Sequence, residues 1–263
     1  MQIGISTATF FKKLYNEDAV RLMDEWGIPT CEVFFTSYCE YGKEFSETVK
    51  HNKGQVEVYS VHDLTNHFEP QLYSDHPRVR SDAYAMLQKV MEGAETLGAK
   101  YYSFHGIARL KRTFRENFSA VIAETQKIAE FCAKYGVTLS YENVEWAFVN
   151  RPEAFARLKE GCPDLHGLLD IKQTRLSGYD WREYLNAMAG CISHVHVSDV
   201  TGEGKMCLPG RGVFPFDELF SRLADTGFTG NVFIENYPSD YRELREVKES
   251  YEFLRERVQK YEN

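Results

Sequence analysis

The chain has 263 residues, of which 43% are hydrophobic and 14% aromatic, and its formal net charge is −8 at pH 7. This apolar content is enough for a sizeable core and argues against disorder. The negative charge argues against a nucleic-acid partner, because proteins that bind nucleic acid usually present a basic face. We therefore expect a folded protein that does not bind nucleic acid.

The six cysteines are scattered without a C-x-x-C pair, which predicts free thiols in a reducing compartment. The N-terminal sequence lacks the basic segment and long apolar run of a signal peptide. No stretch approaches the roughly 18 consecutive apolar residues that a membrane span needs. These features predict a cytoplasmic protein with no membrane partner.

Short apolar segments recur at regular intervals, mostly bounded by polar residues or glycine, and helical patterns fall between them. The predicted strands are residues 3–6, 31–35, 56–62, 101–105, 138–142, 167–171, 192–197 and 232–235. The predicted helices are residues 17–26, 77–97, 114–135, 152–159, 216–226 and 241–261, with a weaker pattern at 43–51.

Alternation of strands and helices predicts parallel strands joined by crossover helices. Eight such units in about 250 residues are typical of a closed (β/α)8 TIM barrel. The alternative, an open doubly wound sheet, normally has a glycine-rich phosphate turn after its first strand, and the residues at 6–9, STAT, do not form one. With no linker or low-complexity tract in sight, we predict an α/β protein with a single TIM-barrel domain over residues 1–263.

Chemistry in such barrels takes place at the C-terminal ends of the strands. Ionisable side chains end six of the predicted strands, namely His62, His105, Glu142, Asp170, His196 and Glu235. Each has a structural alternative when taken alone: Asp170 could cap the next turn, and Glu142 could pair with an arginine. Several carboxylates around one cavity repel each other strongly, however, and a divalent cation is the simplest remedy.

Three carboxylates and one imidazole, from Glu142, Asp170, His196 and Glu235, suit one Mn²⁺, Mg²⁺ or Co²⁺ ion, with Zn²⁺ as an alternative. His194 and His196 point to the same face of their strand. Such a pair could be metal ligands or core histidines satisfied by neighbouring carbonyls. The sequence thus predicts a metal site at the mouth of the barrel.

The sequence resembles the xylose isomerase-like TIM-barrel superfamily, which includes sugar phosphate isomerases and epimerases, ketose 3-epimerases, hydroxypyruvate isomerase, inosose dehydratase and endonuclease IV. The similarity covers nearly the whole chain. It is carried by LSYEN at 139–143, LLDIKQ at 168–173, HVHVSD at 194–199 with PGRG at 209–212, and FIE at 233–235. The resemblance implies a mononuclear metal held by Glu142, Asp170, His196 and Glu235. It also implies that Glu142 and Glu235 are catalytic and transfer protons on opposite faces of a sugar.

The chain departs from two branches of this superfamily. Endonuclease IV has a histidine where this chain has Gln173, and an Asp-x-His where it has GKM at 204–206, so a DNA-repair function is disfavoured. The ketose epimerases also carry a substrate-contacting histidine at position 173, so their substrate specificity does not transfer directly.

Substrate contacts are expected from residues at the strand ends and in the following loops, namely His62, His105, Lys172, Gln173 and Arg211. Lys172 would suit an acidic or phosphorylated sugar, but a lysine in a loop is often merely solvated. His62 and His105 occupy places where family members bind substrate hydroxyls or, in endonuclease IV, further zinc ions. We expect hydrogen bonds to substrate here, and the alternative is a structural role.

The leading functional hypothesis is a metal-dependent isomerase or epimerase of a small sugar or sugar phosphate. It would act by carboxylate proton transfer through a metal-stabilised enediolate. A keto-polyol (inosose-type) dehydratase could use the same residues. A non-catalytic sugar-binding barrel is disfavoured, because binding alone needs no pair of proton-transfer carboxylates. Family members are commonly dimers or tetramers, so a homo-oligomer is a further expectation.

Overall fold

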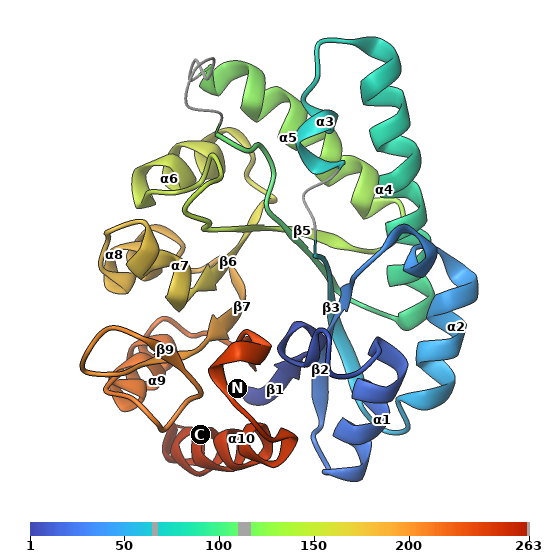
Figure 1. Cartoon of the computed structure of the whole chain (residues 1–263). Coiled ribbons are helices and arrows are strands. Elements are labelled where there is room, and N and C mark those ends of the chain that lie inside the picture. Colours follow the sequence, from blue (N-terminus) through green and yellow to red (C-terminus); the bar gives the residue numbers. More distant parts are fainter. Residues whose placement is uncertain (65–67, 110–116, 262–263) are drawn as a thin grey trace.

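In the computed structural model, which describes residues 1–64, 68–109 and 117–261, parallel strands close into a barrel and the helices surround it (Figure 1). The order around the barrel is β1-β10-β7-β6-β5-β4-β3-β2. The strands are β1 (Gln2–Ser6), β2 (Thr30–Phe35), β3 (Glu57–Asp63), β4 (Tyr101–Phe104), β5 (Thr138–Glu142), β6 (His166–Asp170), β7 (Ile192–Val197) and β10 (Asn231–Ile234). The predicted TIM barrel is therefore confirmed.

The helices follow one another around the barrel in chain order, as the colours of Figure 1 show. They are α1 (Asn16–Glu25), α2 (Lys43–Asn52), α3 (Glu69–Leu72), α4 (Pro77–Leu97), α5 (Phe118–Ala133), α6 (Pro152–Gly161), α7 (Ile171–Leu176), α8 (Trp181–Ala187), α9 (Phe216–Asp225) and α10 (Leu244–Val258). A small antiparallel hairpin, β8 (Asp199–Val200) with β9 (Met206–Cys207), follows β7. The start of the helix expected at 114–135 lies outside the described residues.

Several strand and helix ends lie one to three residues from their expected positions, and three short helices and the β8–β9 hairpin were not predicted. Residue Ile171 was expected in the sixth strand but begins α7, because the Asp170 side chain accepts a hydrogen bond from the Gln173 amide and caps that helix. Helices α3, α7 and α8 have four, six and seven residues, too few for a helical period to stand out. The weak pattern at 43–51 is a helix, α2.

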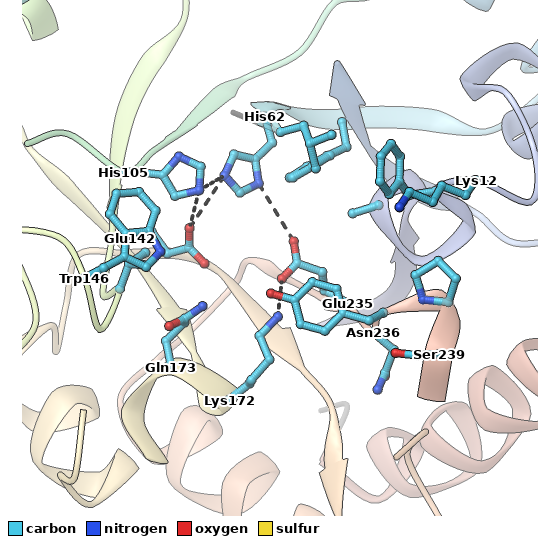
Figure 2. Close-up of a pocket in the computed structure, with 17 residues that line it drawn as sticks. Lys12, His62, His105, Glu142, Trp146, Lys172, Gln173, Glu235, Asn236 and Ser239 are labelled. Carbon is cyan, nitrogen blue, oxygen red and sulfur yellow. Dashed lines mark hydrogen bonds and ion pairs between the residues drawn. The ribbon is translucent and has the colours of Figure 1, made fainter. Parts of the chain in front are cut away.

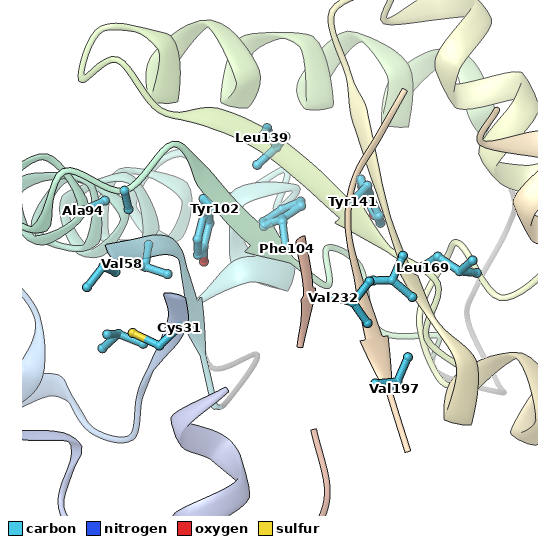
Figure 3. Close-up of a cluster of buried hydrophobic side chains, with 14 of the residues drawn as sticks. Cys31, Val58, Ala94, Tyr102, Phe104, Leu139, Tyr141, Leu169, Val197 and Val232 are labelled. Carbon is cyan, nitrogen blue, oxygen red and sulfur yellow. The ribbon is translucent and has the colours of Figure 1, made fainter. Parts of the chain in front are cut away.

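Alternation along the strands divides the apolar core from the polar interior of the barrel. Leu139 and Tyr141 of β5 belong to the buried cluster between strands and helices, whereas Ser140 and Glu142 alternate with them along the strand and point to the opposite face. Figure 3 shows the outer cluster, with Tyr102, Phe104, Leu139, Tyr141, Leu169, Val197 and Val232 from neighbouring strands. Apolar packing outside the barrel thus turns the polar residues toward its axis.

Across the ranges described above, no helix has both the length and the apolar character required to cross a membrane.

The outer cluster predicts where a truncated side chain destabilises the fold. Leu169 is fully buried, whereas Leu176 on α7 is 57% exposed. We expect Leu169→Ala to lower the free energy of unfolding by about 2–5 kcal/mol, because it leaves a cavity. The matched change Leu176→Ala is expected to stay within about 0.5 kcal/mol. Denaturant unfolding followed by circular dichroism measures both, and equal losses would contradict this assignment of the core.

Candidate active site

The C-terminal ends of the strands surround a cavity of about 450 Å³. Figure 2 shows side chains from several strands and loops facing this space. Of the residues predicted from the sequence, His62, His105, Glu142, Lys172, Gln173 and Glu235 line it. Asp170 and His196 are buried beside these residues. The structure therefore brings the six predicted strand-end residues to one place.

Glu142, Asp170, His196 and Glu235, here called the four-residue cluster, each offer a ligand atom, and these atoms all lie within 4.8 Å of one another. Nδ1 of His196 is 3.6 Å from Oε1 of Glu142 and 3.4 Å from Oε2 of Glu235. Strand register explains part of this convergence, since Asp170 pairs with His196 across β6 and β7. The Asn143 side chain exchanges hydrogen bonds with the Asp170 backbone and fixes the ends of β5 and β6 relative to each other.

Buried polar atoms of this cluster lack partners. Oδ1 of Asp170 accepts the hydrogen bond that caps α7, so this residue does have the capping role that the sequence allowed. Its Oδ2 accepts no hydrogen bond. Oε2 of Glu142 and Nδ1 of His196 also have no hydrogen-bond partner among the described residues. Buried polar groups normally find partners. The donor set and its unpaired atoms fit a hard or borderline divalent cation.

Excess negative charge shows in the pKa values of the carboxyl groups. Burial, with Glu142 and Glu235 close by, raises the pKa of Asp170 to about 7, although Lys172 opposes the rise. Burial would also raise the pKa of Glu235, but His196 and Lys172 outweigh it and hold that pKa below its usual value. Lys172 and His196 therefore compensate the negative charge of Glu235 better than that of Asp170.

Lys172 is buried at the cavity wall. The alternative that this lysine is merely solvated in a loop is therefore excluded. Its ammonium group lies 3.2 Å from Oε2 of Glu235, 3.7 Å from Oδ2 of Asp170 and 4.6 Å from the centre of the Tyr237 ring. Burial alone would lower its pKa, but the two carboxylates raise it above the usual value. Lys172 therefore remains charged at neutral pH.

His62 and His105 form a second group with Glu142. Their Nε2 atoms are 3.1 Å apart, and each is 3.5 Å from Oε2 of Glu142 (Figure 2). Nδ1 of His105 lies 3.2 Å from Oε2 of Glu69. Burial lowers the pKa of His105, but Glu69 and Glu142 reverse this and raise it to about 9. The three side chains line the cavity, and their ligand atoms are close enough to hold a cation.

The sequence analysis missed two buried carboxylates behind the histidines. Glu69, on α3, accepts hydrogen bonds from the backbone amides of His105 and Gly106 and from the Tyr102 hydroxyl. Glu32 lies inside β2, and a charged residue within an otherwise apolar strand was the available signal for it. Glu69 has no comparable signal in the sequence around it.

The structure also places Arg211, Gln173 and His194, the other residues considered from the sequence. Arg211 is not among the described residues that line the cavity, because its guanidinium group pairs with Glu246 and Glu249 of α10. Gln173 lines the cavity, and its side-chain oxygen accepts a hydrogen bond from the Glu145 amide. His194 is buried beneath the cluster, and its ring contacts Ser193 and Ser103.

Residues 20–257 match the sequence pattern of the family described as xylose isomerase-like TIM barrel. Inosose dehydratase of Geobacillus kaustophilus is 24% identical over 230 residues, which cover 74% of each chain. D-psicose 3-epimerase of Clostridium cellulolyticum H10, in a structure with D-tagatose, superposes with a TM-score of 0.78 at 16% identity, covering 98% of this chain and 99% of its own. The IolI protein, in a structure with bound zinc, has a TM-score of 0.81 at 17% identity over 100% of both chains.

At these identities the two structural likenesses show the fold alone. The family pattern matches most of the chain, and the closed barrel agrees with it. The chain therefore belongs to the xylose isomerase-like TIM-barrel family.

Proposed function

We propose that this protein is a divalent-metal-dependent isomerase or epimerase of a small sugar or sugar phosphate. The observation that carries the proposal is the four-residue cluster, in which three carboxylates and an imidazole meet at a cavity with buried atoms left unpaired. Proteins of the same fold support it, since a D-psicose 3-epimerase and an IolI protein with bound zinc share this fold.

Glu142, Asp170, His196 and Glu235 would hold the cation. When bound, such an ion acts as a Lewis acid that stabilises the negative charge developing on a carbonyl oxygen and its neighbouring hydroxyl. The capped Oδ1 of Asp170 keeps that carboxylate in place, so that its Oδ2, which accepts no hydrogen bond and lies 3.7 Å from the Lys172 ammonium group, stays directed toward the cluster. These residues thus act first as a rigid set of donors.

Proton transfer falls to Glu142 and Glu235, which approach the cavity from different sides (Figure 2). The histidines near each glutamate lower its pKa against the effect of burial, and so both are ionised and able to accept a proton. One carboxylate removes the proton next to the carbonyl and the other, once protonated, returns one. Lys172, at 3.2 Å, holds the Glu235 carboxylate in place as a charged partner.

Substrate orientation is assigned to the remaining lining residues. His62 and His105 face the cavity beside Glu142 and would contact hydroxyl groups, while Lys172 and Gln173 line the opposite wall (Figure 2). Phe34 and Trp146 add apolar surface to the same cavity. Arg211 is left out of the substrate contacts because it lies away from this cavity.

Dehydration of a keto-polyol is the second candidate, and one observation favours it. Elimination of water needs an acid beside the departing hydroxyl, and the buried ammonium group of Lys172 is such an acid at the cavity wall. The family relative named inosose dehydratase agrees with this chemistry. Loss of water from the substrate, in place of a stereochemical change, would identify it.

Proton exchange tests the role of the glutamates. In D₂O, the metal-loaded protein is expected to exchange the carbon-bound hydrogen next to the carbonyl of at least one member of a panel of ketoses, their phosphates and keto-polyols. Compared at equal bound metal, Glu142→Gln should abolish this exchange while leaving substrate binding largely intact, because the amide cannot accept the proton. NMR measures exchange, and calorimetry measures binding.

The matched control for that experiment is Glu145→Gln, the same chemical change on an exposed residue three positions along the chain. It should exchange at the rate of the unaltered protein. Exchange that continues unchanged in Glu142→Gln would contradict the role given to this residue.

Cation binding tests the four-residue cluster separately from catalysis. Asp170→Asn retains an oxygen for capping α7 but removes the charge next to the unpaired Oδ2 position. We expect it to bind Mn²⁺ or Co²⁺ much more weakly than the unaltered protein in equilibrium dialysis. Asp180→Asn, at the cap of α8 on the surface, should bind as the unaltered protein does. Equal metal content in all three proteins would argue against Asp170 as a ligand.

A further inference from the structure

A buried carboxylate lies behind the four-residue cluster, inside the barrel. Glu32 of β2 is 0% exposed. Its Oε2 accepts hydrogen bonds from the hydroxyls of Ser60 at 2.8 Å and Ser103 at 2.6 Å, and it lies 3.2 Å from Nε2 of His194. Its Oε1 accepts a hydrogen bond from Ser6 at 3.1 Å. This carboxylate is therefore held from several sides by short polar side chains.

The same Oε1 faces two histidines of the site. It lies 2.9 Å from Nε2 of His196 and 3.4 Å from Nδ1 of His62. Nε2 of His196 makes no hydrogen bond of good geometry, so its contact with Glu32 is a close electrostatic one. The other ring nitrogen of His196 points to Glu142 and Glu235. One imidazole ring thus bridges the interior carboxylate and the four-residue cluster.

This placement determines which nitrogen of His196 carries a proton. A neutral imidazole has one N–H and one lone pair, and either nitrogen can bear the hydrogen. A proton on Nε2 is attracted to Glu32, whereas a lone pair there would lie 2.9 Å from a carboxylate oxygen and be repelled. Nδ1 also faces carboxylates, those of Glu142 and Glu235, so a lone pair on this atom is favoured when a cation lies between them and accepts it.

Glu32 is better placed to orient the histidine than to bind a cation itself. A carboxylate offers about four lone-pair positions, and Glu32 is already contacted by Ser6, Ser60, Ser103 and two histidines. Metal-binding histidines commonly give their second N–H to a carboxylate, which fixes the tautomer and raises the basicity of the ligand.

We infer that Glu32 is a positioning residue that holds His196 with its proton on Nε2 and its Nδ1 lone pair directed at a divalent cation in the four-residue cluster. The inference rests on the proposed function, because it assumes that the cluster binds such an ion. Glu32 also offers a ligand atom within 4.8 Å of those of His62, His196 and Glu235, but its oxygens are already engaged, and it is assigned no direct contact with the cation. Its effect passes through the imidazole alone.

The experiment uses Co²⁺ as the probe, with calorimetry for affinity and visible absorption for the coordination of the ion. Removing a partner of a metal-bound histidine typically costs about 10- to 100-fold in affinity. We expect a loss of this size in Glu32→Gln, together with a changed Co²⁺ spectrum. A merely structural role for Glu32 would leave the spectrum of the folded protein unchanged.

Glu69→Gln is the matched control, because Glu69 is equally buried and contacts His105 in place of His196. It should retain the affinity and spectrum of the unaltered protein for Co²⁺. If Glu32→Gln does not fold, Ser60→Ala replaces it, since it removes one of the hydroxyls that hold Glu32, and a smaller loss in the same direction is expected.

The two proposals fail in different ways. If the unaltered protein binds Co²⁺ and the folded Glu32→Gln variant binds it with the same affinity and spectrum, the inference is overturned and the proposed function stands. If Glu32→Gln does not fold and Ser60→Ala matches the unaltered protein, the inference is likewise overturned. If the unaltered protein binds no Co²⁺, the proposed function and the inference fall together.

Discussion

The structure is dominated by one electrostatic constraint, the burial of several carboxylates within a few ångströms of each other inside a closed barrel. Glu142, Asp170 and Glu235 converge at the cavity, and Glu32 lies behind them. Buried charges are costly unless they are compensated. Lys172 and the histidines compensate them in part, but Asp170 keeps a raised pKa and an unpaired oxygen. In the proposed function, a divalent cation would supply the missing positive charge.

Other features of the site follow from this crowding. The histidines have carboxylates behind them, Glu69 for His105 and Glu32 for His196, so that each ring is held in a defined orientation. Parallel strands bring their ends to a common rim, and the apolar residues that alternate with the polar ones anchor those strands to the helices. The fold therefore places like charges together and holds them there, which is how a rigid donor set for an ion is built.

The barrel and the strand-end residues could be predicted from the sequence, because each strand shows an apolar segment and parallel strands share a rim. Two kinds of feature could not. Helices of four to seven residues carry no clear period, as in α3, α7 and α8. The depth of Lys172 and the contacts of Glu32, Glu69 and Arg211 depend on segments far apart in the chain. Arg211 is the clearest example, since its carboxylate partners lie on α10.

The most direct test of the account is a crystal structure of the protein soaked in Co²⁺, with anomalous scattering recorded at the cobalt edge. The account predicts a strong anomalous peak in contact with Glu142, Asp170, His196 and Glu235 together. Ordered side chains at this site with no peak among them, while cobalt occupies other places on the molecule, would contradict the claim that these four residues gather around a cation.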